Sequence, residues 1–431
     1  MQDSLKPNHS PFNVELFSSR GQWAIFICIC AFVFAVSILQ EYRSYTHFTA
    51  PQNTQEIYAQ VLAQYTKYKN GKSYQVLKLK TEQGEIFYTT SKEDIKDLSH
   101  RFVRIYGKRL ECSFVSYLQH CFFTSYYMSL LSKRDYRDFL RKWIESQHTE
   151  PLIASLYKTL FMADFFPKQW RDLSNKLGIA HLIAISGFHL GILSFALGGI
   201  FTLIYRIFHQ KLSYRNKYFD IGFVVLACLF VYLLVLDFSP SFLRSFVMAV
   251  CGFLVVYSGI NLVSFRLLFV VVCVCLALFP RLVFSIGFGL SVSGVFFIYL
   301  FVRYIPLYRG FWQKMGYALL FNTLIFVDML PLVHWFFPYF TPLSALSILL
   351  SLLFVIFFPA MLIAHIVGLG ALCDSFLQWA MNLNLHSIEF YTPWWFLCLF
   401  ALCAIGAIYI KKLYYMLHIL GFGFFTYMAI L

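Results

Sequence analysis

The sequence predicts an α-helical polytopic membrane protein with a small exported β-barrel domain, OB-like in kind, inserted after the first transmembrane helix. Two observations carry this fold class. Of the 431 residues, 59% are hydrophobic and 13% are charged, a composition far from that of a soluble domain and typical of a chain that crosses a membrane many times. Residues 45–130 interrupt the apolar pattern with charged, strand-like sequence.

The first apolar segment, residues 23–40, is long enough to span a bilayer and lacks a small-residue cleavage site. We therefore expect a retained transmembrane anchor. Lys6 and Arg20 precede it. Because cytoplasmic flanks carry the excess of Lys and Arg, residues 1–22 are predicted to be cytoplasmic and the chain after the anchor to be exported.

Residues 45–130 are predicted to form the exported domain. Apolar residues recur at every second position from Ile57 to Tyr65, which is strand patterning. The pair Asn70-Gly71 predicts a hairpin, since both residues tolerate the positive φ angles of a tight turn, and Gly84 marks another turn. These runs predict a small β-barrel of about eighty residues, for which an OB-like barrel is one candidate.

Basic residues alternate with aromatic ones in this domain. Cationic grooves with aromatic platforms bind single-stranded nucleic acid through phosphate attraction and base stacking. The alternative is a solvated surface over an aromatic core, and acids such as Glu82 and Asp97 dilute the positive charge. Under the first interpretation, the residues in contact with nucleic acid are Lys67, Lys69, Lys78, Lys80 and Arg104.

Of the 11 cysteines, only Cys112 and Cys121 fall in the predicted exported part. The others lie in apolar segments, where a thiol behaves as a small hydrophobic group. If the exported face is oxidising, Cys112 and Cys121 form a disulfide, and two unpaired thiols are the alternative.

Residues 133–180 are predicted to form amphipathic interfacial helices, because Arg and Lys interleave with aromatic side chains there. Residues 181–431 are predicted to form the polytopic membrane core. Its strongly basic loops, 206–217 and 303–314, both fall on the cytoplasmic side when the apolar segments alternate across the membrane.

The alternation meets a conflict further along the chain. Full crossings by residues 343–367 and 394–410 would place Lys411 and Lys412 outside, against the positive-inside rule. A re-entrant hairpin at 343–367, broken near Pro359, returns these lysines to the cytoplasm. Residues 371–391 are too polar to span and are predicted to lie flat.

The stretch HLIAISGFHLG, which we call the signature stretch, places polar groups in otherwise apolar sequence. Intramembrane polar groups usually face a bundle interior or a water-filled cavity, which makes them site candidates. Its AISG is similar to the G-x-S-G of rhomboid-type intramembrane proteases, with Ala184 in place of the first glycine. The candidate residues are His181, Ser186, Gly187 and His189.

Three interpretations of the signature stretch compete. A serine hydrolase takes its histidine from another helix, for which His334 and His365 are loose candidates. A metal site needs three or four ligands, and the sequence has no H-E-x-x-H or C-x-x-C motif. Close helix packing at the glycines is the third. The sequence also lacks G-x-x-x-x-G-K-[ST], so we expect no ATP hydrolysis. We also expect no metal, no cofactor and no enzymatic activity.

Asp237 and Arg244 flank the next pair of apolar segments, in VLDFSPSFLRSFVMAV. An arginine four residues into an apolar segment is expensive unless it pairs or lines a wet path. Asp237 is its candidate partner, and snorkelling of Arg244 to the surface is the alternative. Together with the signature stretch and the formal charge of +14, this pair favours a polar path for a polyanion over simple helix packing.

Three blocks of the sequence together resemble one known family. GIAHLIAISGFHLGIL, preceded by LFMADFFPKQWRDLSNKL, resembles the signature of the ComEC/Rec2 competence proteins. SPSFLRSFVMAVCGFLVV resembles that family's next block, with its intramembrane arginine. LFPRLVFSIGFGLSVSGVFFIYL resembles a third block with a G-F-x-L-S core, whose serine is Ser291.

The resemblance implies an inner-membrane channel that imports single-stranded DNA into the cytoplasm during natural transformation. It implies a multi-pass protein of the cell inner membrane, with residues 45–180 on the exported face. The residues that would line or gate the DNA pathway are His181, Ser186, Gly187, His189, Asp237, Arg244 and Ser291.

The resemblance also implies partners: single-stranded DNA, an exported DNA receptor, a cytoplasmic DNA-translocating ATPase or single-strand-binding proteins, membrane lipid, and further copies of the chain in a homo-oligomer. Gly289 stands where the family often carries glutamine. Many members end in a metallo-β-lactamase-type domain, whose H-x-H-x-D-H motif does not occur in this sequence, so a separate nuclease is expected. An intramembrane serine peptidase and a small-solute transporter are the alternatives.

Overall fold

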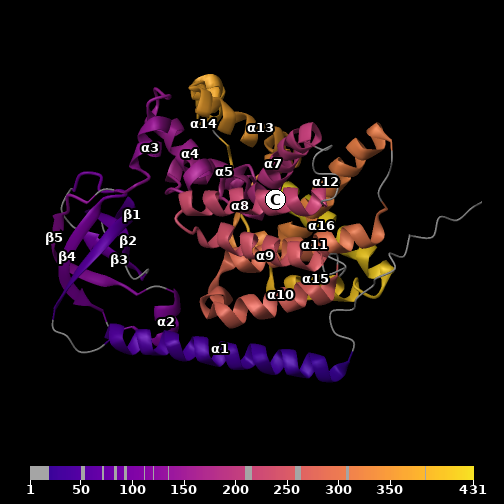
Figure 1. Ribbon diagram of the computed structural model, residues 1–431, viewed down its shortest axis with the longest axis horizontal. Helices are drawn as coiled ribbons and strands as arrows, with labels where there is room; N and C mark the ends of the chain where they lie inside the picture. The colour runs from indigo at the N-terminus through magenta and orange to yellow at the C-terminus, as the bar shows by residue number, and fades with distance from the viewer. Residues whose placement is uncertain are drawn as a thin grey trace, which may run out of the picture. The chain divides into compact units, whose positions relative to one another are not determined.

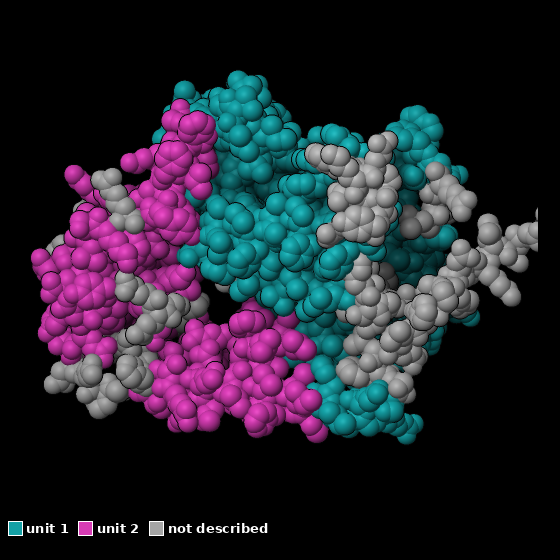
Figure 2. All heavy atoms as spheres, in the orientation of Figure 1, with its two compact units in different colours: residues 1–26, 147–273, 286–431 teal, residues 27–146, 274–285 magenta. Residues whose placement is uncertain are grey.

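The computed structural model describes residues 19–49, 54–69, 72–81, 85–91, 95–110, 112–119, 121–133, 135–208, 216–257, 264–306, 310–383 and 385–431. The chain divides into two units (Figure 2). The helical unit comprises residues 1–26, 147–273 and 286–431, and the sheet unit comprises residues 27–146 and 274–285. The predicted cytoplasmic segment 1–22 lies almost wholly outside the described residues.

The strands of the sheet unit follow the first helix, α1 (Arg20–Thr49), which is longer than the predicted anchor (Figure 1). Its strands pair antiparallel in the order β3-β2-β1-β4-β5. The predicted hairpin is confirmed by the pairing of Lys69 with Lys72, although the turn itself and Gly84 lie outside the described residues. The strands are β1 (Gln55–Lys69), β2 (Lys72–Thr81), β3 (Ile86–Ser91), β4 (Phe102–Arg109) and β5 (Phe123–Leu130).

The predicted closed barrel is corrected to a five-stranded sheet. The outer strands β3 and β5 meet through a single parallel bridge, Tyr88 with Phe122, rather than through a ladder. Phe122 lies one residue before β5 begins, so the described residues of β3 and β5 form no ladder of backbone hydrogen bonds that would close the sheet. A bulge between Val61 and Ala63 bends β1, and the curved sheet surrounds a core that includes Ile57, Leu77, Leu79, Phe87, Val103, Ile105 and Phe123.

Cys112 and Cys121 lie at disulfide-bonding distance, with their Cα atoms 6.2 Å apart, as the sequence predicts. They flank the short helix α2 (Phe114–Gln119). The ring of Tyr117 in α2 lies 5.1 Å from the Arg281 guanidinium, and Arg281 forms two hydrogen bonds of 2.8 and 2.7 Å with the carboxylate of Glu41 in α1. Arg281 belongs to the 3₁₀ helix η1 (Pro280–Phe284).

A buried ionic cluster fixes the chain after β5 to the sheet. Asp135 accepts hydrogen bonds from Arg137 at 3.2 Å, from Arg141 at 3.0 Å and from Gln60 of β1 at 2.9 Å. Burial alone would raise the pKa of Asp135, but the Arg137 backbone N–H and the two guanidiniums outweigh it and lower that pKa to about 2. The sequence pattern predicts that the side chains of Arg137 and Arg141 reach a membrane surface, but both are buried against Asp135 instead.

The aromatic partners in that amphipathic pattern do face outward. In and beside helix α3 (Asp138–Glu145), Tyr136 and Phe139 are 70% and 71% exposed and Trp143 is 45% exposed. An exposed aromatic face of this kind suits the interfacial region of a bilayer. The interfacial role predicted for this segment thus rests on its aromatic side chains.

Helices α4 (Pro151–Met162), α5 (Lys168–Lys176) and α6 (Ala180–Ile183) open the helical unit. Seven described helices, α1 included, are long and apolar enough to cross a membrane. The other six are α7 (Gly187–Phe208), α8 (Lys217–Val235), α11 (Ile286–Tyr304), α12 (Phe311–Phe336), α13 (Ser347–Val367) and α16 (Lys411–Ile430).

Three apolar helices are shorter: α9 (Pro240–Tyr257), α10 (Phe265–Leu278) and α15 (Trp394–Gly406). Helix α14 (Asp374–Met381) follows α13 through the 3₁₀ helix η3 (Gly370–Cys373). The 3₁₀ helix η2 (Pro342–Leu346) leads into α13, and β6 (Tyr339–Phe340) pairs with β7 (Ile388–Glu389). Helices α11, α12, α15 and α16 share a core that includes Phe297, Leu300, Phe400, Tyr414 and Leu417.

The predicted break near Pro359 is wrong, because α13 runs unbroken from Ser347 to Val367. One proline removes one backbone hydrogen bond, which an otherwise apolar membrane helix tolerates. Both ends of α13 contact the segment before the signature stretch. Thr341, just ahead of α13, donates to the Lys176 carbonyl at 3.0 Å, and Gln147 donates to the His365 carbonyl near the far end at 3.0 Å.

Candidate functional site

The polar side chains of the signature stretch cap the start of α7. Helix α6 ends at Ile183 and α7 begins at Gly187, so the backbone N–H groups between them need acceptors. Ser186 Oγ accepts from the Phe188 N–H at 3.3 Å, and His189 Nδ1 accepts from the Ser186 N–H at 3.3 Å. Ser186 is therefore a helix cap, and His189 Nδ1 points at a backbone N–H rather than at the serine hydroxyl.

The His189 ring is fully buried against α13. It is 0% exposed and meets the rings of Phe354 and Phe358 edge-on, at centroid distances of 5.3 and 4.8 Å. Since Nδ1 accepts a hydrogen bond, the ring is neutral and carries its proton on Nε2. His189 holds α7 against α13, so any part it takes in a pathway is that of a support.

His181 behaves differently from His189. Its side chain is accessible at the surface of the described structure, yet the protein around it desolvates the imidazole and lowers its pKa. His181 is therefore neutral at neutral pH, and its ring can supply a hydrogen-bond donor rather than a fixed positive charge.

Gly187 brings the first two sequence blocks into contact. A Cβ at this position would lie 3.0 Å from Ser245 Oγ of α9, closer than side chains normally approach. The glycine thus permits the close α7–α9 crossing, as small residues do at membrane helix interfaces. The contact joins the signature stretch to the block that contains Arg244.

Arg244 in turn joins the second block to the third. Its guanidinium lies 5.5 Å from the ring centroid of Phe288 in α11, a cation–π distance. Ser291, one turn further along α11, is exposed in the described structure. Asp237 lies in the α8–α9 turn, where it and Phe238 adopt left-handed backbone angles, with φ of 49° and 53°. Pairing of Asp237 with Arg244 stays a prediction.

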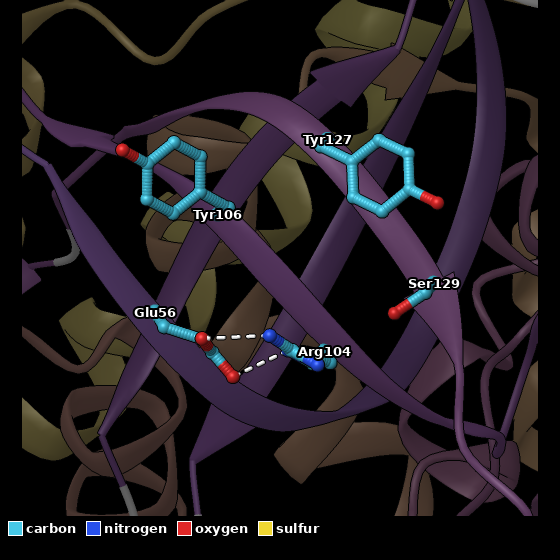
Figure 3. A pocket seen from close by; sticks show the side chains of 5 residues that line it. All are labelled: Glu56, Arg104, Tyr106, Tyr127 and Ser129. Carbon is cyan, nitrogen blue, oxygen red and sulfur yellow. Dashed lines mark hydrogen bonds and ion pairs between the residues drawn. The ribbon is translucent and has the colours of Figure 1, made fainter.

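The sheet unit holds a second candidate site, which we call the tyrosine pocket (Figure 3). Its lining residues are Glu56, Arg104, Tyr106, Tyr127 and Ser129. Arg104 forms an ion pair with Glu56, whose carboxylate also accepts from Tyr58 Oη at 2.7 Å. These two hydrogen bonds lower the pKa of Glu56. Tyr106 and Tyr127 are register partners on β4 and β5 and are 44% and 68% exposed.

The lysines predicted to contact nucleic acid lie on other strands. Lys78 stands opposite Tyr88 in the β2–β3 ladder, 6.0 Å from its ring centroid, and burial lowers its pKa. Lys67 lies 5.8 Å from the Tyr65 ring, and Lys80 is half-buried. The side chain of Lys69 lies outside the described residues. Arg104 is the one member of this set that lines the tyrosine pocket.

A third cluster escaped the sequence analysis. His148 Nδ1 lies 2.9 Å from Asp374 Oδ1, and His148 Nε2 lies 3.0 Å from His365 Nε2. We call these three side chains the histidine network. His148 is more than two hundred residues from both His365 and Asp374 in sequence, and the three belong to no motif, so the only signal was the polarity of His365 within an apolar segment.

A polar pair also lies between two predicted crossings. His418 Nδ1 of α16 is 2.9 Å from Asp328 Oδ1 of α12, and Asp328 is 2% exposed. Asp328 is the one acidic residue of the apolar segment 317–336. That signal could have marked it, because intramembrane acids nearly always have partners.

Comparison with known proteins gives one match. The profile of a family described as Competence protein matches residues 163–431, more than half of the chain. No curated protein matches the chain. No solved structure matches it either. The matched range contains the signature stretch, Arg244 and Ser291.

Proposed function

We propose, from the premise that this chain belongs to the Competence protein family, that it forms an inner-membrane channel for single-stranded DNA. The family supports a role in DNA uptake during transformation, and the long apolar helices make the chain a multi-pass membrane protein. The observation that carries the channel is the meeting of three polar blocks: Gly187 contacts Ser245, and Arg244 next to it contacts Phe288.

The polyanionic strand needs compensation wherever it crosses a region of low dielectric. Arg244 supplies a permanent charge, since its guanidinium does not lose its proton. His181 supplies a neutral donor, and Ser291 a hydroxyl. Ser186 and His189 hold the start of α7, and Gly187 lets α7 and α9 approach. No covalent bond forms or breaks in this path, since Ser186 acts as a helix cap rather than as a nucleophile paired with His189.

On the exported side we assign the first contact with the strand to the tyrosine pocket. Exposed tyrosines offer stacking platforms for bases, worth about 1–3 kcal/mol per base. Arg104 is the nearby cation, but Glu56 neutralises it. Glu56→Gln should therefore strengthen binding of a short single-stranded oligonucleotide by the purified chain in detergent, and Arg104→Gln should weaken it. Two variants that bind with the affinity of the parent would remove the pocket from the route.

The contacts of α13 support an orientation in the membrane. With residues 147–180 on the exported face, the contacts at Lys176 and Gln147 hold both ends of α13 to that face. A helix of 21 residues is about 30 Å long, so a full crossing would carry its far end to the other side. With α13 along the exported face, the next apolar segment, 394–410, returns Lys411 and Lys412 to the cytoplasm.

The proposal is tested by deleting the gene and supplying fluorescent double-stranded DNA. We expect surface capture to persist, while passage of a labelled strand into the cytoplasm and recovery of a chromosomal marker are abolished. Normal marker recovery would overturn the channel. Complementation with Ser186→Ala provides the control against a hydrolase, because loss of a cap weakens α7 by about 1 kcal/mol and should reduce import only partly.

The proposed partners follow from this route. A receptor hands the strand to the exported face, a separate nuclease removes its complement, and an ATPase or single-strand-binding proteins draw it in from the cytoplasm. Membrane lipid surrounds the helices, and further copies of the chain complete a homo-oligomer.

A further inference from the structure

The histidine network joins two distant parts of the helical unit. His148 precedes α4, His365 lies in the last turn of α13, and Asp374 is the first residue of α14. Both imidazoles are enclosed: the His148 side chain is 0% exposed and His365 is 3% exposed. His365 Nδ1 lies 2.7 Å from the carbonyl oxygen of Met361. The four groups form a chain, Asp374 to His148 to His365 to the Met361 carbonyl.

The chain of four groups needs a definite number of protons to complete its hydrogen bonds. It contains three close polar gaps, of 2.9, 3.0 and 2.7 Å, and each needs one proton to be a hydrogen bond. The Met361 carbonyl brings none, an ionised Asp374 brings none, and two neutral imidazoles bring two. With two protons, one gap would set two lone pairs against each other. The geometry therefore requires a third proton.

The surroundings favour that third proton. Tyr157 of α4 stacks on His148 at a centroid distance of 4.8 Å, and Cys373 of η3 adjoins Asp374. Burial raises the pKa of Tyr157 and of Cys373, so both stay neutral. With three protons the network has no net charge, because the carboxylate balances one imidazolium. With two it would be an anion whose carboxylate is only 15% exposed, which partial burial disfavours.

We propose that His148, His365 and Asp374 form a binding site for a single proton, and that this proton joins the α4 segment to the turn between α13 and α14. The described residues contain no group of three His, Cys, Asp or Glu side chains arranged to hold a metal ion, which leaves the proton as the ligand that fits. The proposal stands independently of the DNA channel.

Occupancy of this site can be transmitted to the signature stretch through packed rings. The ring centroids of His365 and Phe161 lie 5.0 Å apart. Those of Phe161 and Phe358 lie 5.9 Å apart, and those of Phe358 and His189 lie 4.8 Å apart. Loss of the proton sets two bare nitrogens 3.0 Å apart and pushes the end of α13 away from α4. Because the joined state holds one proton more, it is favoured at low pH and lost as the pH rises.

The test follows the opening of this turn at Cys373. The full chain is purified in detergent and alkylated from about pH 5 to about pH 8, the range in which imidazoles titrate. Mass spectrometry gives the rate at Cys373 relative to the exposed Cys398. In the parent, release of one proton should raise this ratio by about tenfold per pH unit below the midpoint and leave it level above the midpoint, beyond the change caused by thiol ionisation.

Variants separate the proton from simple packing. His365→Gln supplies an amide N–H that bridges the gap to His148 without an extra proton, so the added pH dependence should vanish. Asp374→Asn removes the balancing charge and should move the midpoint to lower pH. His386→Gln changes an exposed histidine and should match the parent. If His365→Gln keeps the parent's full pH dependence, the proposal is overturned.

Gly370→Ala keeps all three titratable side chains but forces them apart, because its Cβ would lie 2.8 Å from His365 Nε2. This variant should show a high rate of alkylation at Cys373, relative to that at Cys398, at every pH. A ratio that still falls tenfold per pH unit toward acid in this variant would also count against the site. Either result is read without DNA, so failure here leaves the channel proposal untouched.

Discussion

His189 and the histidine network are both buried in the helical unit, yet their ring nitrogens need different numbers of protons to complete their hydrogen bonds. His189 accepts a backbone N–H at 3.3 Å and otherwise meets phenylalanine rings, so it needs only the proton of a neutral imidazole. The network has three gaps for two neutral imidazoles and requires another proton. The histidine in the recognisable motif is structural, and the histidines outside any motif form the titrating site.

The largest expected effect is at Arg244, which carries a permanent charge beside the signature stretch. Arg244→Glu should reduce DNA import by roughly a hundredfold, since placing the wrong charge in the path costs about 3 kcal/mol. Transfer of labelled DNA into the cytoplasm measures the loss. Cys273→Ala, a change in the neighbouring α10, is the matched control and should import normally. Import by Arg244→Glu at the parent's rate would exclude Arg244 from the path.

His189 gives the next largest effect. His189→Leu leaves the Ser186 N–H without its acceptor and should lower the free energy of unfolding by about 1–3 kcal/mol. His189→Asn retains an acceptor and should lose less. His181→Asn, at an accessible position, should change stability by less than about 0.5 kcal/mol while reducing import. Thermal unfolding in detergent distinguishes these outcomes, and a fully stable His189→Leu would contradict the supporting role.

The charged cluster around Asp135 should make the same contribution to the free energy of unfolding at every pH near neutral. The Asp135 pKa of about 2 is depressed, so its contribution is complete above the ordinary value of about 3.9 and is lost as the pH falls through about 2. The corresponding loss is about 2 kcal/mol for the sheet unit. Unfolding of the parent and of Asp135→Asn, followed by tyrosine fluorescence from about pH 2 to about pH 8, should converge only at the acid end. A difference between them that changes around neutral pH would contradict this assignment.

A substitution at Gly187 should give the smallest change in unfolding free energy, and a second substitution at Ser245 provides its control. Gly187→Ala places a methyl group 3.0 Å from Ser245 Oγ and should cost about 1 kcal/mol in unfolding free energy. Ser245→Ala removes the opposing oxygen, and the double variant should recover most of the loss. If the second substitution brings no recovery, the α7–α9 contact is not what limits residue 187.

The fold class could be predicted because its signals are local. Apolar length marks the crossings, alternation marks the strands, and Asn70-Gly71 marks the hairpin. Closure of the sheet could not be predicted, because it depends on whether β3 and β5, far apart in sequence, form a ladder. The unbroken course of α13 through Pro359 was missed for a related reason: the contacts at Lys176 and Gln147 hold both ends of that helix.

The candidate site divides in the same way. Gly187, Arg244 and Ser291 were found because they stand in recognisable blocks, and the contacts at Ser245 and Phe288 explain why those blocks occur together. The histidine network was out of reach, since His148 and Asp374 meet only after more than two hundred residues of intervening chain have folded. Arg104 was named as a cation, but its neutralisation by Glu56 depends on the register of β1 with β4.

The ion pair between Glu41 and Arg281 joins two residues that leave the ribosome at widely separated times. The sheet unit is discontinuous and includes residues 274–285, so its last element, η1, leaves the ribosome some 150 residues after β1 to β5 are complete. Since chains fold from the N-terminus during synthesis, the sheet must wait, without Arg281 against Tyr117 and Glu41, while α7 to α10 are synthesised. The sheet unit is therefore complete only after the chain of α7 to α10 has been made.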